Sequence, residues 1–277
     1  MRTEIKVLGP LEVSIAGTSV VPTASKIRQL LAILAINAGR VVTIPALIEE
    51  IWGNQPPRSV AATLQTYILQ LRRRLGPALA GDGRSARDVL TTTHTGYLLD
   101  VDRDTIDAER YERLGAAGRT AATAGDYPAA SRQLTAALEI WRGPALVDVA
   151  IGAQLRIEAT RLEESRLTDL TLRIDTDLYL GRHHQLLSEL AALCAQHPFI
   201  ESFWAQYMLA LYRCSRPGQA LEQYHTVQKV MRERLGVDPS QWLQRIHLAI
   251  VTGDTVMDDP GFLVTGSADH LPARRSA

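Results

Sequence analysis

The chain has 277 residues, 46% of them hydrophobic, and its 30 basic side chains balance its 30 acidic ones. A chain of this length is expected to hold two domains with sizeable apolar cores. No apolar run approaches the ~20 residues of a membrane span, and no apolar segment follows the charged first six residues. The sequence therefore argues against a membrane protein and against an export signal, and we expect a cytoplasmic protein.

The zero net charge conceals an uneven distribution. Residues 1–101 carry 11 Lys and Arg against 7 Asp and Glu, residues 102–250 carry 17 against 19, and residues 251–277 carry 2 against 4. The basic excess therefore lies in the N-terminal part, where three arginines follow one another at residues 72–74. This distribution fits a protein whose first domain meets an anion.

The cysteines and histidines predict no metal site. Cys194 and Cys214 lie in helical patterns without CxxC spacing, which is typical of reduced core thiols. A zinc site made of His183, His184 and His197 is disfavoured, because adjacent histidines do not share one face of a helix. We expect neither a metal nor a cofactor.

The first part of the chain begins with short strands. Apolar or alternating residues occur at 5–8, 11–15 and 19–21, and turn residues separate them at 9–10 and 16–18. This pattern predicts a small antiparallel meander of three strands.

Two helices are expected next. Residues 25–37 place apolar side chains on one face, and Gly39 follows the end of that pattern. Residues 43–52 form the second helix, with Thr43 as its N-cap and Pro45 in its first turn.

A third helix, over residues 57–75, is the most informative segment. One face is apolar and the other is polar, with a cationic end at the three arginines; the apolar face comprises Val60, Leu64, Ile68, Leu71 and Leu75. We expect Gly76 and Pro77 to end it. Such a helix can rest on a core and lie in the major groove of DNA with its polar face. The alternative is an ordinary surface helix with a solvated basic end.

A hairpin completes the N-terminal module. Residues 89–93 and 97–101 predict two strands, and Gly96 in their connection is expected to supply a positive φ. Strands, three helices and a hairpin in this order predict an α+β winged helix-turn-helix domain over residues 1–101, with the hairpin as the wing. Tyr97 either packs the hairpin against the last helix or brings its hydroxyl to a phosphate.

The remainder predicts an all-α domain over residues 105–252. Glycines recur at helix junctions, at positions 125, 181 and 218, as in stacked helical pairs of the tetratricopeptide (TPR) type. Periodicity alone supports a helical repeat or a bundle. Residues 253–277 are polar and predict a flexible tail, in which residues 260–264 could dock locally.

Several motifs carry a resemblance to a known family. Leu47-Ile-Glu-Glu-Ile-Trp-Gly53, Leu71-Arg-Arg-Arg-Leu75 and Thr95-Gly-Tyr97 resemble marks of OmpR-like winged-helix output domains. The three-strand start and Pro56-Pro57-Arg58 narrow this to the Streptomyces antibiotic regulatory protein (SARP) family. Later segments such as Trp141-Arg-Gly-Pro-Ala-Leu146 and Leu235-Gly-Val-Asp-Pro239 resemble its bacterial transcriptional activation domain.

The resemblance covers residues 4–254 and has departures. Such domains often carry basic residues where this chain has Ala62 and Gln70, and a glycine where it has Cys214 and Ser215. The first pair leaves the operator sequence open, and the second leaves the geometry of one helical turn open.

The resemblance implies a set of DNA-binding residues. On the third helix these are Thr63, Thr66, Tyr67, Gln70, Arg72, Arg73 and Arg74. On the wing they are Thr91, Thr93, His94 and Tyr97. Lys26, Arg28 and Arg58 would contact phosphates near helix starts. For each residue the alternative is a solvated side chain with no DNA contact.

The resemblance also implies a function. We expect a transcriptional activator of an antibiotic or other secondary-metabolite gene cluster, which binds direct repeats in promoter double-stranded DNA as a homodimer and recruits RNA polymerase. No P-loop, strand-linked GxGxxG, nucleophile elbow or HExxH motif is present in the sequence, so an enzyme is not expected. Two alternatives stay open, a DNA-binding repressor that senses a ligand and a helical-repeat scaffold that binds peptides.

Overall fold

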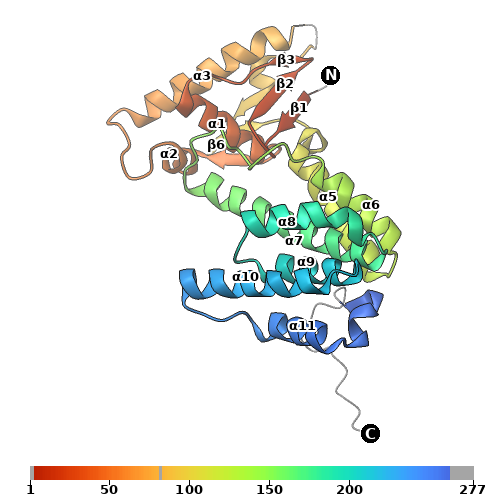
Figure 1. The fold of residues 1–277 in the computed structure, drawn as a ribbon. Coiled ribbons are helices and arrows are strands. Elements are labelled where there is room, and N and C mark those ends of the chain that lie inside the picture. The colour runs from red at the N-terminus through yellow and green to blue at the C-terminus, as the bar shows by residue number, and fades with distance from the viewer. Residues whose placement is uncertain (1–2, 81–82, 263–277) are drawn as a thin grey trace. The chain divides into compact units, whose positions relative to one another are not determined.

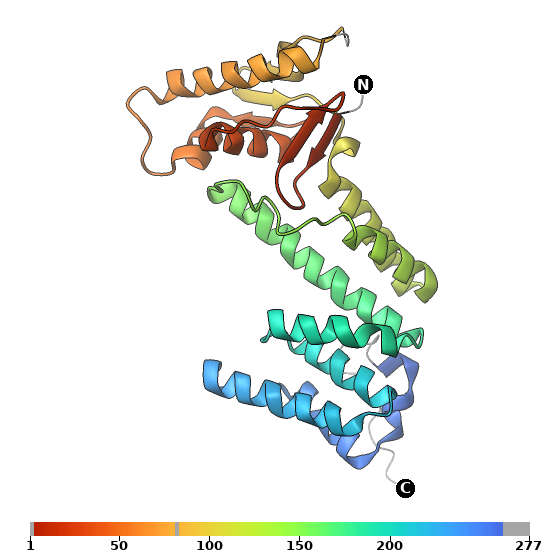
Figure 2. The same cartoon turned by 45° about the horizontal axis from the view of Figure 1, so that its top comes forward.

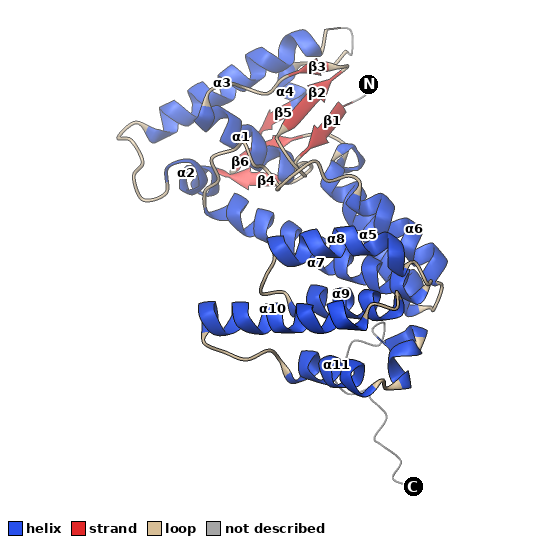
Figure 3. Cartoon of the chain, viewed as in Figure 1, coloured by secondary structure: helices blue, strands red, loops and turns tan. Residues whose placement is uncertain are grey.

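The computed structural model describes residues 3–80 and 83–262. By contacts the chain divides into two compact units: unit 1 is Met1–Ala116 with Ala136–Leu167, and unit 2 is Ala117–Thr135 with Thr168–Ala277. The strands lie in the first part of the chain and the later part is helical, as the colouring in Figure 3 shows. This order confirms the expected fold class, an α+β winged helix followed by an all-α, TPR-like domain.

Unit 1 opens with the expected meander. Its strands are β1 (Thr3–Lys6), β2 (Glu12–Ile15) and β3 (Thr18–Ser19), which form an antiparallel sheet in the order β1-β2-β3 (Figure 1). Ile5 pairs with Val13 in the sheet, and both side chains are buried. The alternation of apolar and polar residues therefore gives the sheet one face toward the core.

Three helices follow, as predicted: α1 (Ser25–Ile36), α2 (Ile44–Trp52) and α3 (Val60–Ala78). The Thr43 hydroxyl accepts a hydrogen bond from the Ala46 N–H at 3.4 Å and caps α2. The predicted end of α3 at residue 75 was wrong, because the helix continues through Gly76 and Pro77. Ala78 and Leu79 are buried, and their burial offsets the one hydrogen bond that Pro77 cannot donate.

The second sheet joins the wing to the strand between α1 and α2. It has the order β4-β6-β5, with β4 (Val41–Thr43), β5 (Leu90–Thr92) and β6 (Gly96–Leu99), and the short α4 (Ala86–Val89) precedes β5. Gly96 does not have the positive φ expected of it. A Cβ at Gly96 would lie 2.0 Å from the Val42 carbonyl oxygen, so close backbone approach is what requires the glycine.

Residues 103–116 and 136–167, parts of the first helices of the helical region, belong to unit 1 and pack on the same core. The elements here are the 3-10 helix η1 (Arg103–Thr105), α5 (Asp107–Thr123), α6 (Tyr127–Leu138) and α7 (Ala153–Tyr179). The Asp107 carboxylate accepts hydrogen bonds from the Val7 and Leu8 N–H groups at 2.8 and 3.1 Å. Burial raises the pKa of Asp107, which these hydrogen bonds partly counteract.

Glu50, near the end of α2, receives the first turn of α7. Its buried carboxylate accepts hydrogen bonds from the N–H groups of Gly152, Gln154 and Leu155 at 2.6, 2.8 and 3.2 Å. The Gln29 side-chain amide of α1 donates to it as well, at 3.1 Å. A carboxylate at the end of α2 therefore caps the start of α7 within unit 1.

Unit 2 consists of antiparallel helices. They are the remaining parts of α5, α6 and α7, then α8 (His183–Gln196), α9 (Glu201–Arg213), α10 (Pro217–Leu235) and α11 (Gln241–Thr252). Trp204 and Cys194 are core residues, and burial raises the pKa of the Cys194 thiol to about 12. No described helix is long and apolar enough to cross a bilayer.

The C-terminal segment has local structure as far as it is described. Two short 3-10 helices, η2 (Thr255–Asp258) and η3 (Pro260–Phe262), follow α11. Met257 is buried, and Phe262 stacks on Trp242 with ring centroids 5.5 Å apart. Residues 263–277 of the expected flexible tail, including part of the expected docking segment, lie outside the described residues.

Candidate nucleic-acid interface

Helix α3 presents a basic, acid-free surface at the edge of unit 1. Its inner face buries Leu64, Ile68, Leu71 and Leu75 against the core. In Figure 2, α1 and the strands lie on one side of α3 and its other side is open within the unit. The sequence of α3 contains three arginines and no acidic residue. A helix held in this way can enter a major groove with its outer face.

The three consecutive arginines have different surroundings. Arg72 is partly buried, and its guanidinium donates to the Leu90 carbonyl at 2.6 and 3.0 Å and to the Thr92 hydroxyl at 2.8 Å. Burial is the main cause of its lowered pKa. Arg73 and Arg74 are exposed, and neither is joined to an acidic side chain in the part of the chain that the structure describes. Arg72 therefore fastens α3 to strand β5, whereas its two neighbours are available to an anion.

The threonines on α3 bond to their own helix. The Thr63 hydroxyl donates to the Ser59 carbonyl at 3.0 Å, and the Thr66 hydroxyl donates to the Ala62 carbonyl at 2.9 Å. These hydroxyls remain able to accept a hydrogen bond, but their protons are in use. Gln70 is exposed and keeps both a donor and an acceptor for a base edge.

The predicted DNA-binding residues of the wing differ in exposure and in hydrogen bonding. His94 is exposed at the tip of the hairpin, and the Thr93 hydroxyl accepts from the Gly96 N–H at 3.1 Å. The Thr91 hydroxyl donates to carbonyls that close α4. Tyr97 is 5% exposed and belongs to the core, so of its two interpretations the packing role agrees with this position.

The three basic residues predicted to contact phosphates near helix starts also differ in their surroundings. Lys26 lies over the Trp52 ring with its Nζ 5.3 Å from the centroid, and Tyr67 stacks on Trp52 at 5.8 Å. Arg58 is exposed in the loop before α3. Arg28 instead donates to the Asp148 carboxylate at 2.6 Å and to the Pro22 carbonyl at 3.1 Å. The structure thus brings Lys26 and Tyr67 together and engages Arg28 within unit 1.

Two residues of this surface did not figure in the sequence-based prediction. Trp52 joins α1, α2 and α3 through its ring contacts, and Thr92 accepts a hydrogen bond from Arg72. Trp52 belongs to one of the motifs that carry the family resemblance, but Lys26 and Tyr67, the residues that its ring contacts, lie 15 residues or more away in the sequence. No local sequence pattern predicts these ring contacts.

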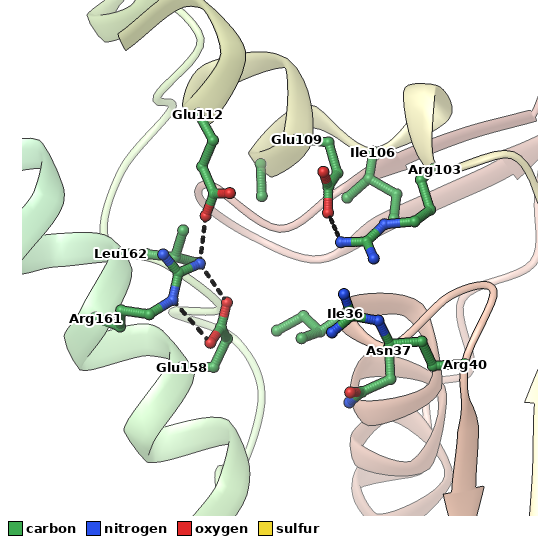
Figure 4. A pocket seen from close by; sticks show the side chains of 11 residues that line it. Ile36, Asn37, Arg40, Arg103, Ile106, Glu109, Glu112, Glu158, Arg161 and Leu162 are labelled. Atoms are coloured by element: carbon green, nitrogen blue, oxygen red, sulfur yellow. Dashed lines mark hydrogen bonds and ion pairs between the residues drawn. The ribbon is translucent and has the colours of Figure 1, made fainter. Parts of the chain in front are cut away.

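A polar cavity of about 270 Å³ lies elsewhere in unit 1, lined by the end of α1, η1 and the first parts of α5 and α7. Figure 4 shows Arg161 of α7 bridging Glu112 and Glu158, Arg103 paired with Glu109, and Arg40 extending into the space. Its lining contains arginines, carboxylates, Asn37 and apolar residues but no nucleophile paired with a base. A small polar molecule fits this chemistry better than an apolar one. No cluster of metal-ligating side chains occurs among the described residues.

Comparison with protein-family models gives two matches. A bacterial transcriptional activator domain matches residues 106–251, and the C-terminal domain of transcriptional regulatory proteins matches residues 18–99. Together they span the helical region and most of the winged helix.

Individual relatives agree with these matches. Regulatory protein DnrI of Streptomyces peucetius is 48% identical over 266 residues, covering 96% of this chain and 98% of DnrI. Transcriptional regulator RedD of Streptomyces coelicolor is 36% identical over 260 residues, covering 94% of this chain and 73% of RedD. The structure of Mycobacterium tuberculosis EmbR in complex with a low-affinity phosphopeptide superposes with a TM-score of 0.84 at 34% identity, covering 96% of this chain and 69% of EmbR.

Proposed function

Because the chain belongs to the SARP family of DNA-binding transcriptional activators, we propose that it binds direct repeats in promoter double-stranded DNA and activates an antibiotic or other secondary-metabolite gene cluster. It is a regulator and not an enzyme, as the names of its relatives and both family matches indicate. The observation that carries the proposal is the outer face of α3, which is exposed, cationic and free of acidic residues.

In this proposal the predicted residues divide into two groups. The contact group would meet DNA and consists of Thr63, Thr66, Tyr67, Gln70, Arg73, Arg74, Thr93, His94, Lys26 and Arg58. The supporting group would hold the surface in shape and consists of Arg72, Thr91, Tyr97 and Arg28. The division rests on exposure and on the hydrogen bonds described above.

The contact group would supply affinity and selectivity in different ways. Arg73 and Arg74 would neutralise phosphates, a sequence-independent term that weakens with salt. Gln70 would pair with the edge of an adenine in the major groove. The helical domain of residues 105–252 would join two protomers head to tail on adjacent repeats and contact RNA polymerase.

A matched pair of neighbouring arginines tests the interface. Arg73→Ala should weaken binding to specific and random duplexes alike and reduce the slope of log affinity against log salt by about 0.9, the value for one phosphate contact. Arg72→Ala should lower the melting temperature, because it removes the hydrogen bonds to β5, while Arg73→Ala should leave that temperature unchanged. An unchanged salt slope for Arg73→Ala would place this side chain off the DNA.

Footprinting of the full chain on the promoters that flank its own gene tests the regulatory role. Protection of two or more regularly spaced repeats upstream of the −35 region supports an activator that bridges to polymerase. Protection across the promoter core would instead support the ligand-sensing repressor, for which the polar cavity of unit 1 offers a site to examine. No protection even at low salt would support the peptide-binding scaffold.

A further inference from the structure

The outer face of α3 is less polar than its sequence suggests. Ala62, Thr66, Leu69 and Arg73 are spaced by four, three and four residues, so they form one strip along the helix. The Thr66 hydroxyl donates to the Ala62 carbonyl, which commits its proton to the backbone. Leu69 is 47% exposed. An apolar strip made of Ala62, Thr66 and Leu69 therefore leads to the cation of Arg73.

The protein's own packing does not account for Leu69. The residue lies outside the apolar core that the described part of unit 1 forms, on the side of α3 opposite Leu64, Ile68 and Leu71. Exposure alone would mean little, because Leu248 on α11 is 56% exposed and single exposed leucines are common. Leu69 differs in its setting, since it is the only large aliphatic side chain exposed on a helix with three arginines and no acidic residue.

The major groove contains one apolar group that matches this strip. Thymine presents a C5-methyl group there, and none of the other three bases does. We propose that Leu69, with the γ-methyl group of Thr66, contacts a thymine methyl and so requires an A·T pair beneath the middle of α3. The inference rests on the proposed function, and it assigns a base-specific contact to Leu69, which the residues predicted from the sequence do not include.

The neighbouring side chains suit this contact. Gln70 follows Leu69 by one residue, about 100° around the helix, and its amide matches the edge of adenine. Arg73 lies one turn further along and would fix the helix on the backbone. One turn of α3 would therefore combine a thymine methyl contact, an adenine hydrogen bond and a phosphate anchor.

Single-methyl deletion in the DNA tests the proposal. Duplexes selected by the full chain from a random-sequence pool supply the probe, and each thymine is replaced in turn by deoxyuridine, which removes the methyl group and keeps base pairing. Wild-type affinity should fall about fourfold at one or two positions per half-site, the effect of exposing one buried methyl group. The Leu69→Ala variant should bind the parent duplex several-fold more weakly than the wild type. Its affinity should not fall further when the sensitive thymines are replaced by deoxyuridine.

Two controls keep the outcome interpretable. Leu248→Ala removes a leucine of α11 that is somewhat more exposed than Leu69, and this variant should be as sensitive to uracil at each position as the wild type. Alanine is a strong helix former, so Leu69→Ala should keep the wild-type melting temperature. A selected site with no uracil-sensitive thymine, or a Leu69→Ala variant as sensitive as wild type, overturns the inference while salt-dependent DNA binding still supports the proposed function. Failure of the wild type to bind any duplex at low salt overturns both.

Discussion

Replacing Glu50 with alanine tests how the winged helix of unit 1 is joined to α7. The substitution removes the acceptor of three backbone N–H groups, those of Gly152, Gln154 and Leu155. It leaves the Gln29 hydrogen bond to the Glu50 backbone carbonyl, at 2.7 Å, in place. Besides the side-chain cap of α7, the change removes only the second Gln29 hydrogen bond, the one to the Glu50 carboxylate at 3.1 Å.

The expected cost follows from the burial of these donors. Leu155 is fully buried, so its N–H would stay unsatisfied at a cost of about 1–3 kcal/mol. Gly152 and Gln154 are partly exposed and can turn to water, which limits their loss to about 1 kcal/mol each. The lost interaction with the positive end of α7 adds about 0.5–1 kcal/mol. We expect a total of about 3.5–6 kcal/mol.

Thermal unfolding followed by circular dichroism measures this cost. For a unit of this size each kcal/mol shifts the melting temperature by about 2–4 °C, so Glu50→Ala should melt about 10 °C below wild type. The matched control is Glu49→Ala, which removes the adjacent, exposed carboxylate and should change the melting temperature by no more than about 1–2 °C. If both variants melted at the same temperature, Glu50 would not hold α7 and the cap would be energetically unimportant.

Three further outcomes follow from the structure. In a urea titration, Gly96→Ala should destabilise the protein by more than about 3 kcal/mol, because the new methyl group would lie 2.0 Å from the β4 backbone. The control Gly218→Ala, in the first turn of α10 with open space around it, should be neutral or stabilising. Asp175, whose pKa burial raises to about 7, destabilises the fold as pH rises from about 4 through 7. Asp175→Asn should therefore gain up to about 4 kcal/mol over wild type across that window and remain level above it, and parallel pH profiles of the two proteins would contradict this. Arg28→Ala should leave the salt slope of DNA binding unchanged, because the guanidinium is engaged by Asp148, and a reduced slope would return Arg28 to the contact group.

Much of the fold could be predicted from the sequence because its signals are local. Apolar periodicity located all three helices of the winged helix, and Thr43 with Pro45 marked the start of α2. In the helical region Gly125 and Gly181 lie at helix junctions as predicted, and Gly218 lies in the first turn of α10.

The errors arose where tertiary contacts outweigh local preference. Pro77 predicts the end of a helix, but burial of the two residues that follow keeps α3 intact for another turn. The position of Gly96 in a hairpin predicts a positive φ, whereas its actual constraint is the backbone of strand β4, more than 50 residues earlier in the chain. A single sequence does not show that Gly96 lies against strand β4.

The candidate interface shows the same limit at the level of side chains. Arg72, Arg73 and Arg74 cannot be distinguished from the sequence, because adjacent arginines on a helix carry the same charge. What distinguishes the three arginines is strand β5, because among them Arg72 donates hydrogen bonds to the Leu90 carbonyl. Burial likewise distinguishes Tyr97 from the exposed His94.

The hydrogen bonds from Arg72 to strand β5 have a consequence for the DNA sites this chain can use. They tie α3 to strand β5 of the wing, so in the proposed complex with DNA the protein would set the distance between the contact made by α3 and the contact made by the wing. A base pair inserted within a half-site could not be absorbed by bending between helix and wing. An insertion between two half-sites would meet no such constraint from this module. The length of each half-site in the proposed target promoters should therefore be invariant.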